Sequence, residues 1–155
     1  MILDSTLEFC DAVSVATTAG TSLIGNQIDL TTVRNIGAGQ PVYLVITVDT
    51  AIVTGGSAGT IQFVLASDDS ASVHTTTSTR HITTTAYTTD DDPTIPAGTL
   101  LYVGALPSGI YSQVDYEQFL GLLLIIGTTT TTAGKINAFL TIDPPGWKAF
   151  TDAVN

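Results

Sequence analysis

The sequence is poor in positive charge, in cysteine and in long apolar runs. Only 4 of its 155 residues are Lys or Arg against 14 Asp or Glu, so the formal charge is −10. Nucleic-acid binding needs a basic patch that four cations cannot supply, which excludes nucleic acid as a partner. The longest apolar run, residues 119–126, is too short for a membrane helix, and the single Cys10 cannot form an intrachain disulfide. An acid at position 4 argues against a secretory leader, so we expect a cytoplasmic protein without a membrane partner.

Threonine supplies much of the polarity that charge does not. There are 28 Thr residues, while charged residues make up only 12% of the chain. Threonine is β-branched and suits a half-buried pleated surface. The composition therefore predicts an all-β domain.

Alternating apolar residues predict strands over 42–49, 60–66 and 135–142. Residues 119–126 are apolar on both faces, so they predict a strand covered on both sides, and 100–105 resemble them. Weaker strands are expected near 12–16, 28–30, 72–75 and 80–84. The core is expected to contain Leu44, Ile46, Phe63, Leu123, Ile125 and Leu140. We predict one domain over residues 1–155, a jelly-roll-like β-sandwich of eight or nine strands.

Candidate catalytic motifs are better explained as turns. Residues 55–59, Gly-Gly-Ser-Ala-Gly, match the nucleophile elbow of hydrolases, but a strand pattern follows where that elbow requires a helix. We therefore interpret 55–59 as a hairpin loop, and the threonine run 128–132 likewise. The acidic pair at 68–69, the acidic triplet at 90–92 and the histidines at 74 and 81 lack the spacing of a metal site. We expect no enzyme activity, no metal and no cofactor.

Several segments, in their order along the chain, resemble a known family. They are residues 1–4, 7–12, 28–30, 35–45, 48–51 and 65–69. The chain resembles the jelly-roll cement, or decoration, proteins of tailed double-stranded DNA bacteriophages. The resemblance implies a structural virion protein, without catalysis or cofactor, that forms a homo-oligomer and binds major capsid proteins on the outer surface of the head. The alternative is a soluble β-sandwich binding module of carbohydrate-binding or adhesin type.

The two ends of the chain are the regions where we expect partner contacts. Residues 1–11 and 144–155 are interpreted as terminal segments that can extend from the sandwich, since Pro144 and Pro145 break the preceding strand pattern. Their apolar side chains are candidate contacts to the capsid: Leu3, Leu7, Phe9, Trp147 and Phe150. The alternative is that both segments fold back onto their own subunit, where Trp147 would cap its own core. The oligomer is expected to be a dimer or a trimer held by apolar contacts and strand edges.

Overall fold

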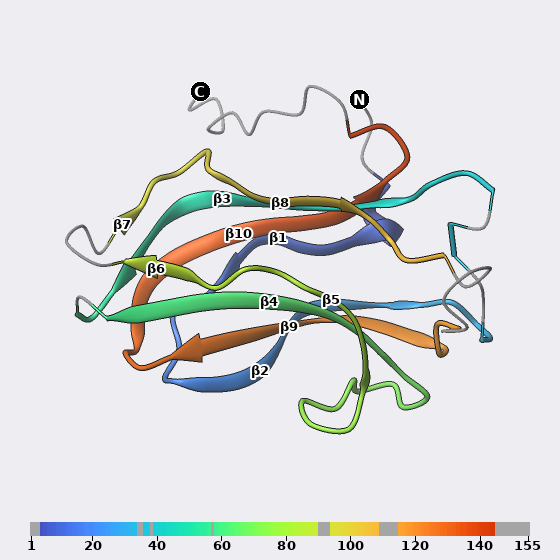
Figure 1. Cartoon of the computed structure of the whole chain (residues 1–155), viewed down its shortest axis with the longest axis horizontal. Helices are drawn as coiled ribbons and strands as arrows, with labels where there is room; N and C mark the ends of the chain where they lie inside the picture. Colours follow the sequence, from blue (N-terminus) through green and yellow to red (C-terminus); the bar gives the residue numbers. More distant parts are fainter. Residues whose placement is uncertain are drawn as a thin grey trace.

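Two antiparallel β-sheets packed face to face make up the computed structural model (Figure 1). The structure describes residues 4–33, 36–37, 39–56, 58–89, 94–108 and 115–144. In chain order the elements are η1 (Ser5–Leu7), β1 (Glu8–Ser14), β2 (Gly20–Asp29), β3 (Tyr43–Thr54), β4 (Gly59–Asp68), β5 (Thr79–Thr83), β6 (Tyr87–Thr89), β7 (Thr94–Ile95), β8 (Leu100–Ala105), β9 (Phe119–Gly127) and β10 (Thr131–Thr141). The predicted all-β class is confirmed.

The strand order is that of a jelly roll. The first sheet runs β1-β10-β3, with β7 and β8 both on the far edge of β3, and the second runs β2-β9-β4, with β5 and β6 on β4. The first two strands of the chain thus lie beside the last two, with β1 on β10 and β2 on β9. This is the pattern of two nested Greek keys, so the predicted jelly-roll sandwich is confirmed.

Both turns predicted as hairpins instead cross between the sheets. The connection at residues 55–58 leads from β3 in the first sheet to β4 in the second, and residues 128–130 lead from β9 back to β10. The two connections lie at the same end of the sandwich, where the amide of Gly55 donates to the carbonyl of Thr130 at 2.8 Å. The sequence correctly marked the reversals. A turn signal does not determine which sheet the next strand joins, so the hairpin interpretation was wrong.

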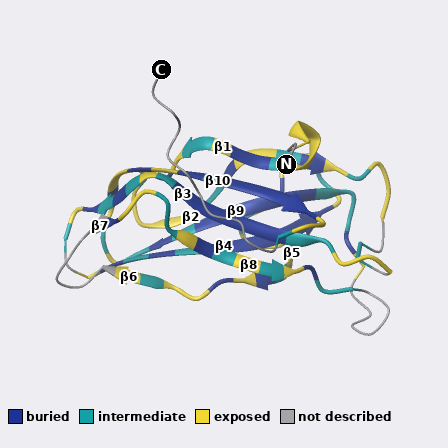
Figure 2. Cartoon of the chain, turned by 90° about the horizontal axis from the view of Figure 1, so that it is seen from above, coloured by how far each residue is buried: buried dark blue, intermediate teal, exposed yellow. Residues whose placement is uncertain are grey.

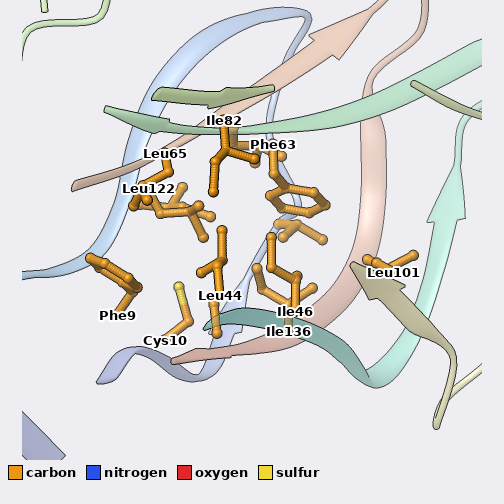
Figure 3. Packing of buried hydrophobic residues seen from close by; sticks show 14 of the residues in the cluster. Phe9, Cys10, Leu44, Ile46, Phe63, Leu65, Ile82, Leu101, Leu122 and Ile136 are labelled. Atoms are coloured by element: carbon orange, nitrogen blue, oxygen red, sulfur yellow. The ribbon is translucent and has the colours of Figure 1, made fainter. Parts of the chain in front are cut away.

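The inward faces of the two sheets form the main core (Figure 3). The predicted alternating rows point into it, and Leu44, Ile46, Phe63 and Leu140 are buried as expected. Ile142 lies beyond the end of β10 and is exposed. Figure 2 shows the burial concentrated along the central strands of both sheets.

The outer face of β9 carries a second, smaller cluster. Leu123 packs there with Val64, Ala66 and Val73, and Val73 belongs to the long β4–β5 connection, which folds over this face. The prediction of cover on both faces of residues 119–126 is therefore confirmed. Ile125, expected in the core, lies on this outer face and is only half-buried. The strand expected near 72–75 is wrong, because Val73 is buried from a loop.

Strand β1 begins at Glu8, earlier than the predicted start near residue 12. Phe9 and Cys10 are consecutive and both fully buried, which breaks the alternation that sequence patterns rely on. Register shifts on either side of Cys10 allow this, and Ala12 beside them adopts a φ of 47° and donates its amide to Asn137 Oδ1 at 2.7 Å. The bulged strand explains why the strand signal was weak here.

Candidate functional site

The predicted contact residues fall into three groups in the structure. Leu3, Trp147 and Phe150 lie outside the described residues. Leu7 is exposed in η1. Phe9 is fully buried in the main core, so its assignment as a partner contact was wrong: its side chain belongs to the sandwich, and the N-terminal segment ahead of β1 ends at Leu7.

The described chain begins and ends at one corner of the sandwich. Glu8 at the start of β1 is the register partner of Phe139 near the end of β10, so the chain enters and leaves from adjacent strands of one sheet. We call Asp4, Leu7, Glu8, Ile142 and Asp143 the terminal corner. Leu7 and Ile142 expose 38% and 60% of their surface there, beside three acidic residues. The corner thus combines apolar surface with negative charge.

Short-range hydrogen bonds fix the entry to this corner. Asp4 caps η1: its Oδ1 accepts from the Thr6 amide at 2.9 Å and from Thr6 Oγ1 at 2.7 Å. These hydrogen bonds favour the ionised carboxylate and lower the pKa of Asp4. Leu7 is therefore presented on a defined turn.

A cluster of polar side chains that the sequence did not reveal joins three elements. Ser67 on β4 is fully buried, and its Oγ lies 2.7 Å from His81 Nε2 on β5. The same Oγ donates to Glu117 Oε2 at 3.2 Å and accepts from the Glu117 amide, also at 3.2 Å. Ser67 is thus hydrogen-bonded to both His81 and Glu117, and the histidine tautomer sets the direction of its bond to His81 Nε2. Positions 67, 81 and 117 are too far apart in the sequence for a local motif to find them.

Tyr116 completes this cluster and ties it to the β8–β9 connection. Its ring stacks on the His81 ring with centroids 4.1 Å apart, and its hydroxyl donates to the Pro107 carbonyl at 2.7 Å. Burial raises the pKa of Tyr116 to about 12 and lowers the pKa of His81 to about 4. His81 is therefore neutral at pH 7.

Ser, His and Glu side chains suggest a hydrolase triad, but the geometry differs from one. In a triad the acid orients the histidine, whereas here Glu117 contacts the serine. Ser67 also has no exposed surface from which to attack a substrate. The arrangement is that of a structural network that satisfies buried polar groups.

The acidic turn after β4 is built around Asp68. Its Oδ1 accepts from the Ser70 amide at 3.0 Å, and its Oδ2 accepts from the His74 amide at 2.9 Å and lies 2.8 Å from His74 Nδ1. Burial alone would raise the pKa of Asp68, but these hydrogen bonds hold it well below its usual value. The carboxylate that could have served a cation thus holds the β4–β5 loop instead. Across the described residues, no three His, Cys, Asp or Glu side chains are grouped to hold a metal ion.

The Gly-rich motif gains no catalytic context from the structure. Ser57 itself lies outside the described residues. Strand β4 follows from Gly59, where a nucleophile elbow would need a helix.

In the part of the chain that the structure describes, no helix is long and apolar enough to cross a membrane.

The fold defines the chain as a single jelly-roll β-sandwich over its described strands. A family model described as Bbp16 matches residues 9–140, which span the sandwich from β1 to β10. The chain belongs to the Bbp16 family. No curated protein matches it.

Proposed function

We propose that the protein is a capsid cement protein, which binds the outer surface of a bacteriophage head and stabilises contacts between major capsid proteins. Two things support the proposal: the jelly-roll sandwich, and the resemblance of the first 70 residues to cement proteins of tailed phages. On this view the chain acts in the virion, after assembly in the host cytoplasm, and carries out no chemistry.

The terminal corner is the observation that carries the proposal. The two terminal segments expected to contact the capsid leave the sandwich from neighbouring strands, so they can engage one partner site together. Leu7 and Ile142 offer apolar surface at this point. Asp4, Glu8 and Asp143 add negative charge that favours a partner surface with Lys or Arg side chains.

Reinforcement then follows from binding equilibria. A protein that binds the assembled head but not its separated subunits stabilises the assembly by mass action, with about 2.7 kcal/mol at a hundredfold excess over Kd. Two packed layers and an all-antiparallel sheet framework make the subunit a rigid bridge for this purpose.

Heads that lack the protein provide the direct test. We expect the purified full chain to co-sediment with such heads and to raise the temperature at which they release DNA. A Leu7→Ser/Ile142→Ser variant should bind at least about tenfold more weakly, because it loses apolar contact area without touching the core. Val33→Ser, at an equally exposed apolar residue in the β2–β3 connection, is the matched control and should bind normally. If the full chain does not bind, the cement proposal is wrong.

Truncations test the terminal segments themselves. Deleting residues 1–3 or 145–155 removes Leu3 or the Trp147 and Phe150 pair while leaving every described strand intact. Deleting through residue 9 would remove Phe9 from the core and would test folding instead. We expect both shorter proteins to fold, and each to protect heads less than the full chain. Full protection by both would disprove a contact role for the termini.

The alternative of a carbohydrate-binding module has less support in the described residues. Such modules present aromatic platforms, but every large apolar side chain found exposed in the described part of the chain is aliphatic. Binding of the protein to a glycan panel, together with failure to bind heads, would favour this alternative.

A further inference from the structure

The outer face of the first sheet carries a row of apolar side chains. Leu44 on β3 and Leu140 on β10 belong to the main core, so their neighbours Val45 and Phe139 point to the opposite, outer face. Val45 is the register partner of Phe139 on one side and of Val103 on β8 on the other. The three side chains therefore form one row across three strands, on a face that antiparallel sheets usually turn toward water with polar residues.

Burial changes abruptly along this row. Val45 is fully buried and Phe139 exposes 2% of its surface, whereas Val103 exposes 45%. Leu100, the other outward apolar residue of β8, exposes 43%, so the cover on both faces that the sequence suggested for 100–105 is absent there. Something therefore covers the outer face over β10 and β3 and ends before β8.

The described strands do not supply this cover. The second sheet packs on the inner face, and no described strand lies over the outer face of the first (Figure 1). Val45 and Phe139 belong to neither of the two clusters that buried residues form in the described chain. Both are buried in a single chain with no second molecule beside it, so neither a second copy nor a head accounts for their burial. The cover therefore belongs to another part of the same chain.

Sequence and topology favour residues 145–155, which lie outside the described residues, as this cover. Strand β10 ends at Thr141, so the segment continues directly from one of the two covered strands. The sequence Pro-Pro-Gly at 144–146 is typical of a turn and allows the chain to reverse over the sheet. Eleven residues span up to about 36 Å when extended, while neighbouring strands lie only about 5 Å apart. The segment also carries Trp147 and Phe150, whose rings suit an apolar seat.

We propose that residues 145–155 form a strap across β10 and β3 in the free protein, with the Trp147 ring seated over Val45 and Phe139. One large aromatic side chain buries about 150–250 Å², which is enough to shield both residues. The seat belongs to the free protein, so this inference does not depend on the proposed function. Contact of the same segment with a head requires that it first leave the sheet, which makes the seat a competitor of that contact.

Fluorescence of the purified full chain tests the seat, because Trp147 is its single tryptophan. We expect the wild type to emit at a shorter wavelength than a peptide of residues 145–155, and Val45→Thr/Phe139→Thr to shift the emission to that of the peptide. Threonine suits a strand, so this variant keeps both sheets. Val103→Thr, on the same face but outside the cover, is the matched control and should leave the emission unchanged. Wild-type emission like that of the peptide, or a double variant without a shift, would overturn the proposal.

NMR gives a second measurement that needs no variant. The wild type should show NOEs between the Trp147 indole protons and the Val45 methyl groups, and these NOEs should persist on dilution. Their absence would count against the seat, and their loss on dilution would place the segment on a second copy instead of its own sheet. Failure of the full chain to bind heads would refute the cement proposal and leave the strap standing, since both measurements use the free protein.

Discussion

At the scale of single residues, position relative to the two sheets decides what each apolar side chain contributes. Leu123 and Ile125 belong to the same strand and point to the same outer face of the second sheet. Only Leu123 is fully buried, because Val73 from the β4–β5 loop lies over it. The sequence alone could not separate these two residues, since both occupy an unbroken apolar run.

Alanine substitutions should reveal this difference. Leu123→Ala should lower the free energy of unfolding by about 2–4 kcal/mol, whereas Ile125→Ala should cost about half as much or less. Urea denaturation of both variants measures the two values side by side. Equal losses would mean that the loop does not cover Leu123 in solution.

His81 gives the protein a dependence on mild acid. Burial lowers the pKa of His81 to about 4, below the ordinary value near 6.5. Between pH 4 and pH 6.5 the His81 side chain is protonated in the unfolded chain but stays neutral in the folded protein. The stability that depends on neutral His81 is therefore complete above pH 6.5 and is lost as the pH falls toward 4.

Replacing His81 should make stability less sensitive to pH. We expect His81→Asn to flatten the fall in unfolding free energy between pH 6.5 and pH 4, relative to the wild type. NMR titration of the His81 ring provides an independent reading, with a midpoint near pH 4 expected. A midpoint of the His81 ring near its ordinary value of 6.5 would contradict its buried environment.

At the scale of elements, the β4–β5 connection behaves as a structured cover and not as a loose loop. Asp68 anchors its first half through the Ser70 and His74 amides. The Val73 amide donates to Gln27 Oε1 on β2 at 2.8 Å, which fixes the middle of the loop against the sheet. Gly121 leaves the space into which Val73 packs.

Asp68→Asn should loosen this cover. An asparagine supplies one acceptor oxygen where the carboxylate supplies two, so at least one donor loses its partner, at a cost of about 1–3 kcal/mol. Exchange should accelerate at amides of β9 beneath the loop. Asp11→Asn removes the same charge from an exposed position and should change neither property.

The sequence predicted those features whose signal lies within one strand and missed those that depend on contacts between distant segments. Alternating rows on β3, β4 and β10 were predicted because period-2 patterning is contained within each strand. Phe9 was misassigned because the bulge in β1 turns two consecutive residues inward. The Ser67, His81 and Glu117 network was missed because only the folded topology brings β4, β5 and the approach to β9 together.

At the scale of the whole molecule, the large negative charge should give the expected self-association and the proposed head binding opposite responses to salt. Contacts between copies work against like-charge repulsion, so screening at higher ionic strength should strengthen self-association. Docking of the acidic terminal corner on a basic head surface should weaken instead.

Measurements at about 0.05 and 0.5 M NaCl distinguish these effects, since the Debye length falls below ~5 Å over that range. We expect the Kd of self-association to fall and the Kd for heads to rise. The same direction of change in both would show that one of the two surfaces has been assigned the wrong electrostatic character.

The pairing of the first strands with the last has a consequence for synthesis on the ribosome. Strand β1 lies beside β10 and β2 beside β9, so neither early strand can pair until almost the whole chain has been translated. Contacts between such distant segments are slow to form, because a long loop must close first. The nascent chain therefore carries unpaired apolar strands until translation ends, which makes it a client for ribosome-associated chaperones and makes prematurely terminated fragments prone to aggregation.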